Sequence, residues 1–370
     1  MSQPYKQYRL HAFLRTLSPL HITSPEGARL DVENMKLVYG ESMGIPLNQV
    51  QKLNVQEMGG VVRQVPVIAA NNIMGRLRRH TATKVLDVLK AKGQKVTIST
   101  YSALQCGAAT GKPDGRDVYF SEYREAREHP YVGLLGGGPR MMRRYVRAMN
   151  AVPYMDATSF MFGRNKHPHL DEAVHKSAQD ARRLTQFWIL NRNDDLRELV
   201  NISQAQDTIE NFNEEINKRQ QSILADSKSN ADGEGSSRHS TRSFSSFEFV
   251  VPGVYFPMSF DLNVNDAQLG LFLMALDSFA ATERLGGHAR NGMGQFSLSD
   301  VVLTDDDNNI VADNLFANNR LRQDDPVVQE ALKAWMVAAE QLNGPDLDRL
   351  FAPPVEEAKG KKAKKAEEAA

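Results

Sequence analysis

Cysteine is almost missing from this sequence, which has one in 370 residues. A single thiol cannot form an internal disulfide, so the fold has no disulfide framework, and this fits a reducing cytoplasm. Cys106 has no paired motif around it. We therefore expect a small buried residue at this position.

A net charge of one sign is also missing, because 45 basic residues balance 45 acidic residues. Global charge thus gives no support for nucleic-acid binding, which has to rest on local clusters. Two basic clusters occur, at residues 76–80 and 140–147. A third, at 359–365, is flanked by four glutamates, and we predict a disordered, solvated tail there.

Long apolar runs are the third absence. No stretch approaches the roughly 18 apolar residues of a membrane span, and the polar residues from Tyr5 to Arg9 interrupt any signal-peptide core. We expect a cytoplasmic chain with no membrane partner. The length allows one large core, or one core with insertions.

Apolar periodicity predicts both strands and helices. Strands are expected at residues 5–17, 254–264 and 294–303. Helices are expected at 71–93, at 170–193, from an N-cap at Asp266 to Phe279, and at 326–343 with Trp335 and Met336 inward. In the first strand Arg9, His11, Phe13 and Arg15 share one face, which we expect to be half exposed. Pro257 removes a ladder donor and indicates an edge position or a bulge.

A polar stretch at residues 198–248 interrupts these patterns. It cannot bury enough apolar surface to order itself alone, although Ile209, Phe212, Ile216 and Ile223 indicate a short helix within it. Because strong strand signal resumes directly afterwards, we interpret the stretch as a projecting arm.

The helix at residues 71–93 is a candidate phosphate site. Asn71 or Asn72 is a good N-cap, and Arg76, Arg78 and Arg79 follow within its first turns. Gly75 is unfavourable in a helix by about 1 kcal/mol relative to alanine, which the close approach of another backbone would explain. Cations and the helix N-terminus could hold phosphates together; the alternative is a solvated helix face.

A glycine-rich loop at residues 285–295 lies between a helix pattern and a strand pattern. Its backbone N–H groups can face a phosphate, with charge added by side chains. Its candidate binding residues are Gly286, Gly287, His288, Arg290, Asn291 and Met293. The alternative is a tight connection with Gly286 as helix C-cap.

A second glycine-rich region, at residues 107–140, precedes four arginines. Arg140, Arg143, Arg144 and Arg147 suggest a second nucleic-acid contact, or else solvate an exposed helix. His167, His169 and His175 lack a recognisable ligand spacing. We expect surface or core histidines there, no metal and no cofactor.

Several motifs together resemble a known family. They are the strand end Leu17-Ser-Pro-Leu-His-Ile-Thr23, the Pro66–Gly75–Arg78 element, and the insertion before Val251-Pro-Gly-Val-Tyr-Phe256. The glycine loop, Leu285-Gly-Gly-His-Ala-Arg-Asn-Gly-Met-Gly-Gln295, completes them. This order resembles the RAMP (repeat-associated mysterious protein) superfamily of CRISPR systems. It is most similar to the guide-RNA backbone subunit of type IV complexes.

The resemblance implies an α+β fold with a modified RNA-recognition-motif core, ferredoxin-like (βαββαβ), at residues 1–303. Fingers would lie at about 94–170 and a thumb arm at about 198–250. A helical extension at 304–353 and a charged tail at 354–370 would follow. The aromatic motif of an ordinary RNA-recognition sheet is missing, so stacking on the sheet is unsupported.

The resemblance also implies a non-catalytic subunit that coats guide RNA (crRNA) in a helical filament of identical copies. It would contact other CRISPR effector subunits and present the guide for pairing with target nucleic acid. Asp31 is a candidate counterpart of a nuclease residue in relatives, but its surroundings do not match, and no cleavage is expected. The alternatives are a RAMP endoribonuclease using His288 and a phosphate- or nucleotide-binding metabolic enzyme.

Overall fold

The computed structural model describes residues 4–25, 28–29, 46–57, 60–107, 120–138, 141–177, 183–193, 202–208, 210–218 and 242–352. These form two compact units. The first consists of Met1–Ile22, Gln51–Thr185 and Val250–Ala370, and the second of Thr23–Val50 and Gln186–Phe249. Arg140, Asp31 and the tail from residue 354 lie outside the described residues.

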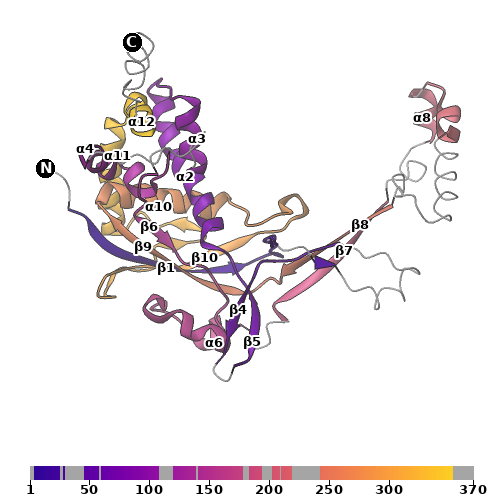
Figure 1. The fold of residues 1–370 in the computed structure, drawn as a ribbon, viewed down its shortest axis with the longest axis horizontal. Coiled ribbons are helices and arrows are strands. Elements are labelled where there is room, and N and C mark those ends of the chain that lie inside the picture. Colours follow the sequence, from indigo (N-terminus) through magenta and orange to yellow (C-terminus); the bar gives the residue numbers. More distant parts are fainter. Residues whose placement is uncertain are drawn as a thin grey trace, which may run out of the picture. The chain divides into compact units, whose positions relative to one another are not determined.

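A five-stranded antiparallel sheet is the centre of the first unit (Figure 1). Its strands in spatial order are β11 (Ile310–Ala312), β10 (Phe296–Asp305), β1 (Lys6–Thr16), β9 (Tyr255–Val264) and β6 (Val146–Ala148). With α2 (Ala70–Ala91) between β1 and β6, and α10 (Asp266–Thr282) between β9 and β10, the chain follows a strand–helix–strand–strand–helix–strand order. That order is the one expected of a ferredoxin-like core, and the α+β fold class is confirmed.

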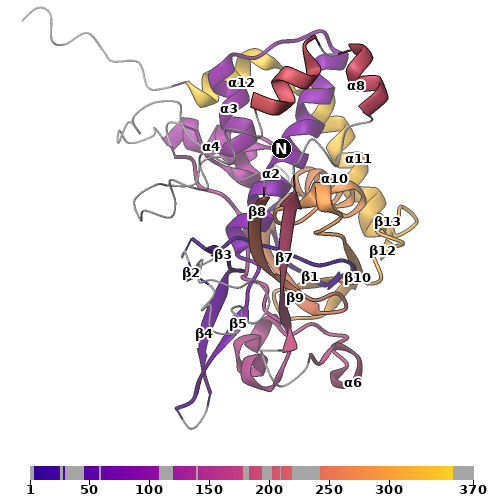
Figure 2. The ribbon, with the colours of Figure 1, turned by 90° about the vertical axis from the view of Figure 1, so that its right-hand side faces the viewer.

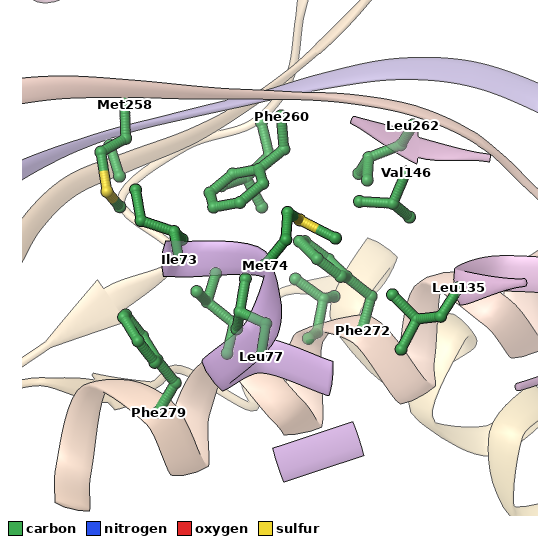
Figure 3. Packing of buried hydrophobic residues seen from close by; sticks show 14 of the residues in the cluster. Ile73, Met74, Leu77, Leu135, Val146, Met258, Phe260, Leu262, Phe272 and Phe279 are labelled. Atoms are coloured by element: carbon green, nitrogen blue, oxygen red, sulfur yellow. The ribbon is translucent and has the colours of Figure 1, made fainter. Parts of the chain in front are cut away.

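Two helices pack on one face of this sheet (Figure 3). Phe260 of β9 contacts Phe272 of α10 edge to face, and Ile73 and Leu77 of α2 complete the buried layer. Helix α11 (Pro326–Gln341) packs against α10 at Gly270, where a Cβ would collide with the Ala331 carbonyl oxygen. Helices α3 (Ile98–Cys106), α4 (Phe120–Glu128), α5 (Val132–Leu135) and α12 (Gly344–Phe351) complete this layer.

Most of the opposite face of the sheet is buried as well, so the expected half exposure is wrong for Arg9, His11 and Phe13, whereas Arg15 is exposed. The segment that covers it contains the 3-10 helices η2 (Asp156–Met161) and η3 (Gly163–Asn165) and the short helix α6 (Glu172–His175). The Phe13 ring stacks on His167 at 4.1 Å and on His175 at 3.8 Å. His167 and His175 are core residues, one of the two alternatives that the sequence leaves open. They close the face on which the sheets of RNA-recognition motifs stack bases.

The second unit contains a four-stranded sheet with the order β2-β3-β8-β7. Its strands are β2 (Ala28–Arg29), β3 (Pro46–Asn48), β7 (Thr185–Asn193) and β8 (Arg242–Val250), and β3 pairs with β8 in parallel. The helix expected at 170–193 is therefore wrong, because Trp188 packs as a strand residue against Phe249 at 4.7 Å. Within the polar insertion, helix α8 spans Ile202–Thr208, while the part from 219 to 241 lies outside the described residues.

Smaller elements complete the first unit, as a second view shows (Figure 2). Strands β4 (Lys52–Gln56) and β5 (Val62–Pro66) form a hairpin. Strands β12 (Phe316–Ala317) and β13 (Arg320–Leu321) form another, so the extension after residue 303 begins with strands before its helices. At Pro257, β9 pairs only with β1, because β6 reaches β9 only from Phe260 to Leu262; the edge position is confirmed.

Three local predictions need correction. Asn265, one residue before Asp266, caps α10 by accepting a hydrogen bond from the Gln268 N–H at 2.9 Å. Met336 is 62% exposed, although Trp335 is buried as expected. Cys106 is exposed, and its thiol donates to the Ser102 carbonyl oxygen one turn earlier.

Acid should destabilise the covered sheet face. Burial lowers the pKa of His11 and of His167 to about 4, below the ordinary 6.5. Both imidazoles are thus neutral when folded, so the unfolded chain binds more protons between pH 6.5 and 4. We expect a loss of stability on the order of 1–2 kcal/mol per histidine at pH 5, measured by urea unfolding at several pH values.

A matched pair of variants tests the origin of this loss. The His167 Nδ1 atom accepts the His169 N–H at 3.0 Å, and an asparagine oxygen can accept in its place without titrating. His167→Asn should therefore remove the His167 contribution to the pH dependence and leave that of His11, whereas His169→Asn, at a partly exposed position, should reduce the pH dependence less. An equal slope in the wild type and His167→Asn would contradict the assignment.

Candidate nucleic-acid interface

The N-terminus of α2 is capped from outside the helix. The Asn150 side-chain oxygen accepts a hydrogen bond from the Ala70 N–H at 2.8 Å, and Ala69 is the N-cap residue. The expectation that Asn71 or Asn72 caps the helix is wrong. Both lie inside the first turn, where Asn71 is exposed and the Asn72 oxygen accepts from Arg76 Nε at 3.2 Å.

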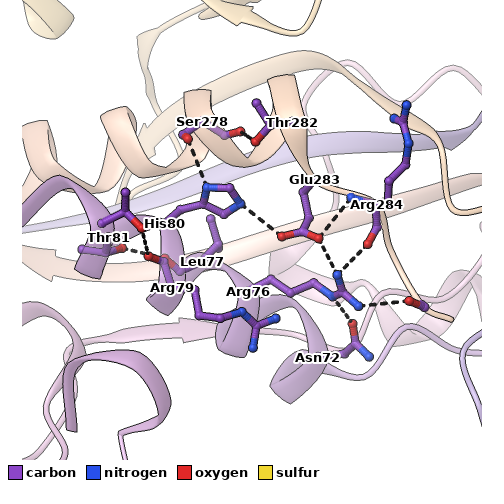
Figure 4. A network of polar contacts seen from close by, with 12 residues as sticks. Asn72, Arg76, Leu77, Arg79, His80, Thr81, Ser278, Thr282, Glu283 and Arg284 are labelled. Carbon is purple, nitrogen blue, oxygen red and sulfur yellow. Dashed lines mark hydrogen bonds and ion pairs between the residues drawn. The ribbon is translucent and has the colours of Figure 1, made fainter. Parts of the chain in front are cut away.

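Arg76 ties α2 to the glycine loop (Figure 4). Its guanidinium pairs with the Glu283 carboxylate at 2.5 Å and donates to the carbonyl oxygens of Arg284 and Gly286. His80 Nε2 lies 3.1 Å from the other Glu283 oxygen. Although burial opposes ionisation, His80 and Arg76 hold the pKa of Glu283 at about 2. Arg76 is therefore committed to the fold and has no guanidinium face left for a phosphate.

Arg78 is committed in a similar way. It donates to the Gly136 carbonyl oxygen at 2.9 Å and to the Leu135 carbonyl oxygen at 2.5 Å. Arg79 differs, because its side chain is exposed and has no hydrogen-bonding partner within the described ranges. Of the three arginines that the sequence places on this helix, only Arg79 can bind an external anion.

Gly75 leaves an open notch on the exposed side of α2. A Cβ built at this position would meet nothing within 4 Å. The close protein backbone that we expected there is thus absent from the described chain. Gly75 lies one turn before Arg79 and one turn after Asn71, so the notch is bordered by polar and cationic side chains.

The glycine loop is built against the end of β1. The Gly287 N–H donates to the His21 carbonyl oxygen at 2.8 Å, and a Cβ on Gly286, at φ 75°, would collide with that oxygen. The C-cap of α10 is Glu283, so the alternative role of Gly286 as that cap is excluded. The loop needs glycine here to approach the β1 end closely.

The loop presents some of its predicted site residues and hides others. Arg290 and Asn291 are exposed in the 3-10 turn η6 (Ala289–Asn291), whereas Met293 is fully buried and cannot contact a ligand directly. His288 adopts a left-handed backbone conformation with φ 58°. Its ring lies 5.1 Å from that of His21, edge to face, and burial together with the His21 ring lowers the pKa of His288.

We use the name α2 groove for the candidate residues on the two elements that Arg76 joins, which are Asn71, Gly75, Arg79, Arg284, Arg290 and Asn291. Arg284 was missed by sequence reasoning because it stands just before the glycine loop. Its backbone binds Arg76 while its side chain is exposed. His21 was missed because a strand-end histidine gives no signal until the loop is folded beside it.

The other predicted cluster lies across the sheet from α2. Val146 points into the helix-side core with Leu262 (Figure 3). Because successive side chains in a strand alternate, Arg147 and its register partner Asp261 point to the opposite face. Arg143 and Arg144 are exposed in the segment before β6, which is not the helix considered as an alternative. Arg143, Arg144, Arg147 and Arg164 line one pocket.

Two further findings concern only the described residues. They contain no group of three or more His, Cys, Asp or Glu side chains placed to hold a metal ion. They also contain no helix that is both long enough and apolar enough to cross a membrane.

Fold and surface together define an α+β protein in which Arg76 joins a helix to a glycine-rich loop and exposed arginines stand on both elements. The RAMP superfamily model matches residues 13–297, and the chain belongs to that superfamily. No curated protein matches the sequence. Among solved structures, the chain is similar to one titled "Type IV-B CRISPR Complex", with 14% identity and a TM-score of 0.43. That match covers 79% of this chain and 89% of the other.

The structural role of Arg76 can be separated from binding. Arg76→Ala leaves Glu283 partly buried without its main cation and leaves two carbonyl oxygens of the loop without a donor. We expect a loss of roughly 2–3 kcal/mol in the free energy of unfolding, measured by denaturant titration. Arg79→Ala is the control and should change it by less than about 0.5 kcal/mol. Equal losses of stability in the two variants would mean that Arg76 does not hold α2 and the glycine loop together.

Proposed function

We propose that this chain is a non-catalytic guide-RNA-binding backbone subunit of a type IV-like CRISPR ribonucleoprotein. Copies of it would assemble along one guide and present it for pairing with a target strand. Other effector subunits of the complex would be its further partners. Membership of the RAMP superfamily supports this role, and the α2 groove supplies the surface for the RNA.

The observation that carries the proposal is the open notch at Gly75. Glycine weakens a helix by about 1 kcal/mol relative to alanine, and no packing within the described chain requires it. An external backbone that approaches the helix closely does require it. Arg79, one turn after this notch on the same helix, is exposed and adds positive charge there.

The chemistry of the groove suits a sugar–phosphate strand. Guanidinium groups bind phosphate oxygens in a forked geometry, and contacts to phosphates position a nucleic acid without reading its sequence. The guide would then select the target by base pairing, as in RNA-guided systems generally. Asn71 and Asn291 add neutral hydrogen-bonding groups at the edges of the groove.

Substitution of Gly75 separates helix stability from RNA binding. Gly75→Leu should raise the free energy of unfolding by several tenths of a kcal/mol, because leucine favours helix and its Cβ meets nothing within 4 Å. The same variant should weaken guide-RNA binding at least tenfold, because its side chain fills the notch. Fluorescence anisotropy with labelled guide RNA measures the second effect.

A matched control uses another exposed helical position. Glu330→Leu lies on α11, away from the α2 groove, and should leave RNA affinity unchanged. If Gly75→Leu bound RNA as tightly as the wild type, the groove would not be the guide site.

A second candidate function has one observation in its favour. The paired rings of His21 and His288 offer two imidazoles beside loop N–H groups, and two imidazoles can act as general acid and base in RNA cleavage. Against this, His21 is only 1% exposed, so its access to a ribose hydroxyl is poor.

Cleavage separates the two functions. Labelled CRISPR repeat RNA, incubated with the chain in a chelator, should remain intact if the chain is a scaffold. Cuts that disappear in His288→Ala but persist in the catalytically irrelevant variant His169→Ala would establish the ribonuclease instead.

A further inference from the structure

We propose that Arg144, Arg147 and Arg164, with Arg143 at the margin, form a second site for nucleic-acid backbone, which we name the outer site. It extends the proposed function, because it gives each subunit two separate contacts with nucleic acid. Its ligand is a single-stranded segment distinct from the one in the α2 groove.

The position of the outer site separates it from the groove. Arg147 projects from β6 on the sheet face opposite α2 and α10. Arg164 comes from the segment that covers this face, where its carbonyl oxygen accepts a hydrogen bond from Arg9 at 3.2 Å. One strand held against Gly75 therefore does not reach the outer site without passing around the sheet.

The acidic side chains near the outer site are largely occupied. Arg9 pairs with Asp261 at 3.0 Å. Both oxygens of Asp305 accept from Asn309, at 2.8 and 3.0 Å. Arg144, Arg147 and Arg164 are exposed, and within the described ranges none of the three has an ion-pair partner. Asp306 also lines the pocket, so one further acidic side chain stands beside the exposed arginines of the site.

Rigid supports hold part of the site in place. The Arg143 guanidinium lies 5.3 Å from the centroid of the Tyr145 ring, and Arg127 stacks on the same ring at 3.7 Å. The Arg127 guanidinium is also bonded to the Asn263 carbonyl oxygen at 2.7 Å. An array of several guanidiniums along a strand and a facing loop suits repeating phosphates better than a single carboxylate.

The test compares two triple variants of the full chain. The outer variant carries Arg144→Gln, Arg147→Gln and Arg164→Gln; the groove variant carries Arg79→Gln, Arg284→Gln and Arg290→Gln. Arg320→Gln with Arg322→Gln, two exposed arginines elsewhere, is the control. The readouts are guide-RNA affinity, capture of a complementary strand by guide-loaded protein, and the salt dependence of each.

For the outer variant we expect guide affinity within about twofold of the wild type. Capture of the complementary strand should fall at least tenfold, and its slope of log K against log salt should decrease by about 2, since three contacts each contribute roughly 0.7. Unchanged capture and slope would overturn the outer site. So would a variant that changes only the size of the assembly, because the arginines would then bind carboxylates of a second copy.

The groove variant distinguishes this proposal from the preceding one. The groove variant should lose guide RNA but retain weak, salt-sensitive binding of a bare single strand. If the outer substitutions then abolish this remaining binding, both sites are supported. If the groove variant binds guide RNA normally, the guide site is wrong while the outer site is still judged by its own slope. If no strand binding depends on the outer arginines, the outer site is rejected.

Discussion

The ion pair between Arg76 and Glu283 is the interaction on which the groove depends. It joins the second turn of α2 to the end of α10, and the same guanidinium bonds two carbonyl oxygens at the start of the glycine loop. Helix propensity alone cannot set the distance between two helices and a loop. Since the pair is largely removed from water, it also acts strongly at short range, and His80 supports it from the neighbouring turn.

The arginines divide into those that hold the fold and those that face outward. Arg9, Arg76, Arg78 and Arg127 are bonded to carboxylates, to carbonyl oxygens or to tyrosine rings. Arg79, Arg147 and Arg284 are exposed. A basic cluster in a sequence mixes both kinds, because one helical turn carries neighbouring residues to different faces.

The regular elements were predictable because their periodicity is strong. Strands β1 and β9 and helix α10 follow directly from alternation and from the apolar spacing at Leu269, Phe272 and Phe279. Strand β7 was not predictable, because Phe187, Trp188 and Leu190 also fit the apolar stripe of a helix. Only its pairing with β8 determines that this segment is a strand. The candidate site was predictable in part. The sequence indicates the helix and the loop, but it does not indicate which of their arginines are free of partners within the fold. That depends on Glu283 and on the carbonyl oxygens of a loop at 135–136, which are distant in sequence.

The internal neutralisation of so many arginines has a consequence for encounter and assembly. A chain whose formal charges sum to zero casts only a weak electric field beyond the Debye length of about 8 Å in cell-like salt. It would meet a polyanion by diffusion with little long-range electrostatic steering. Selectivity between polyanions would then be set by their dissociation rates after local contacts have formed. The same neutrality means that like molecules brought side by side on one strand repel each other little.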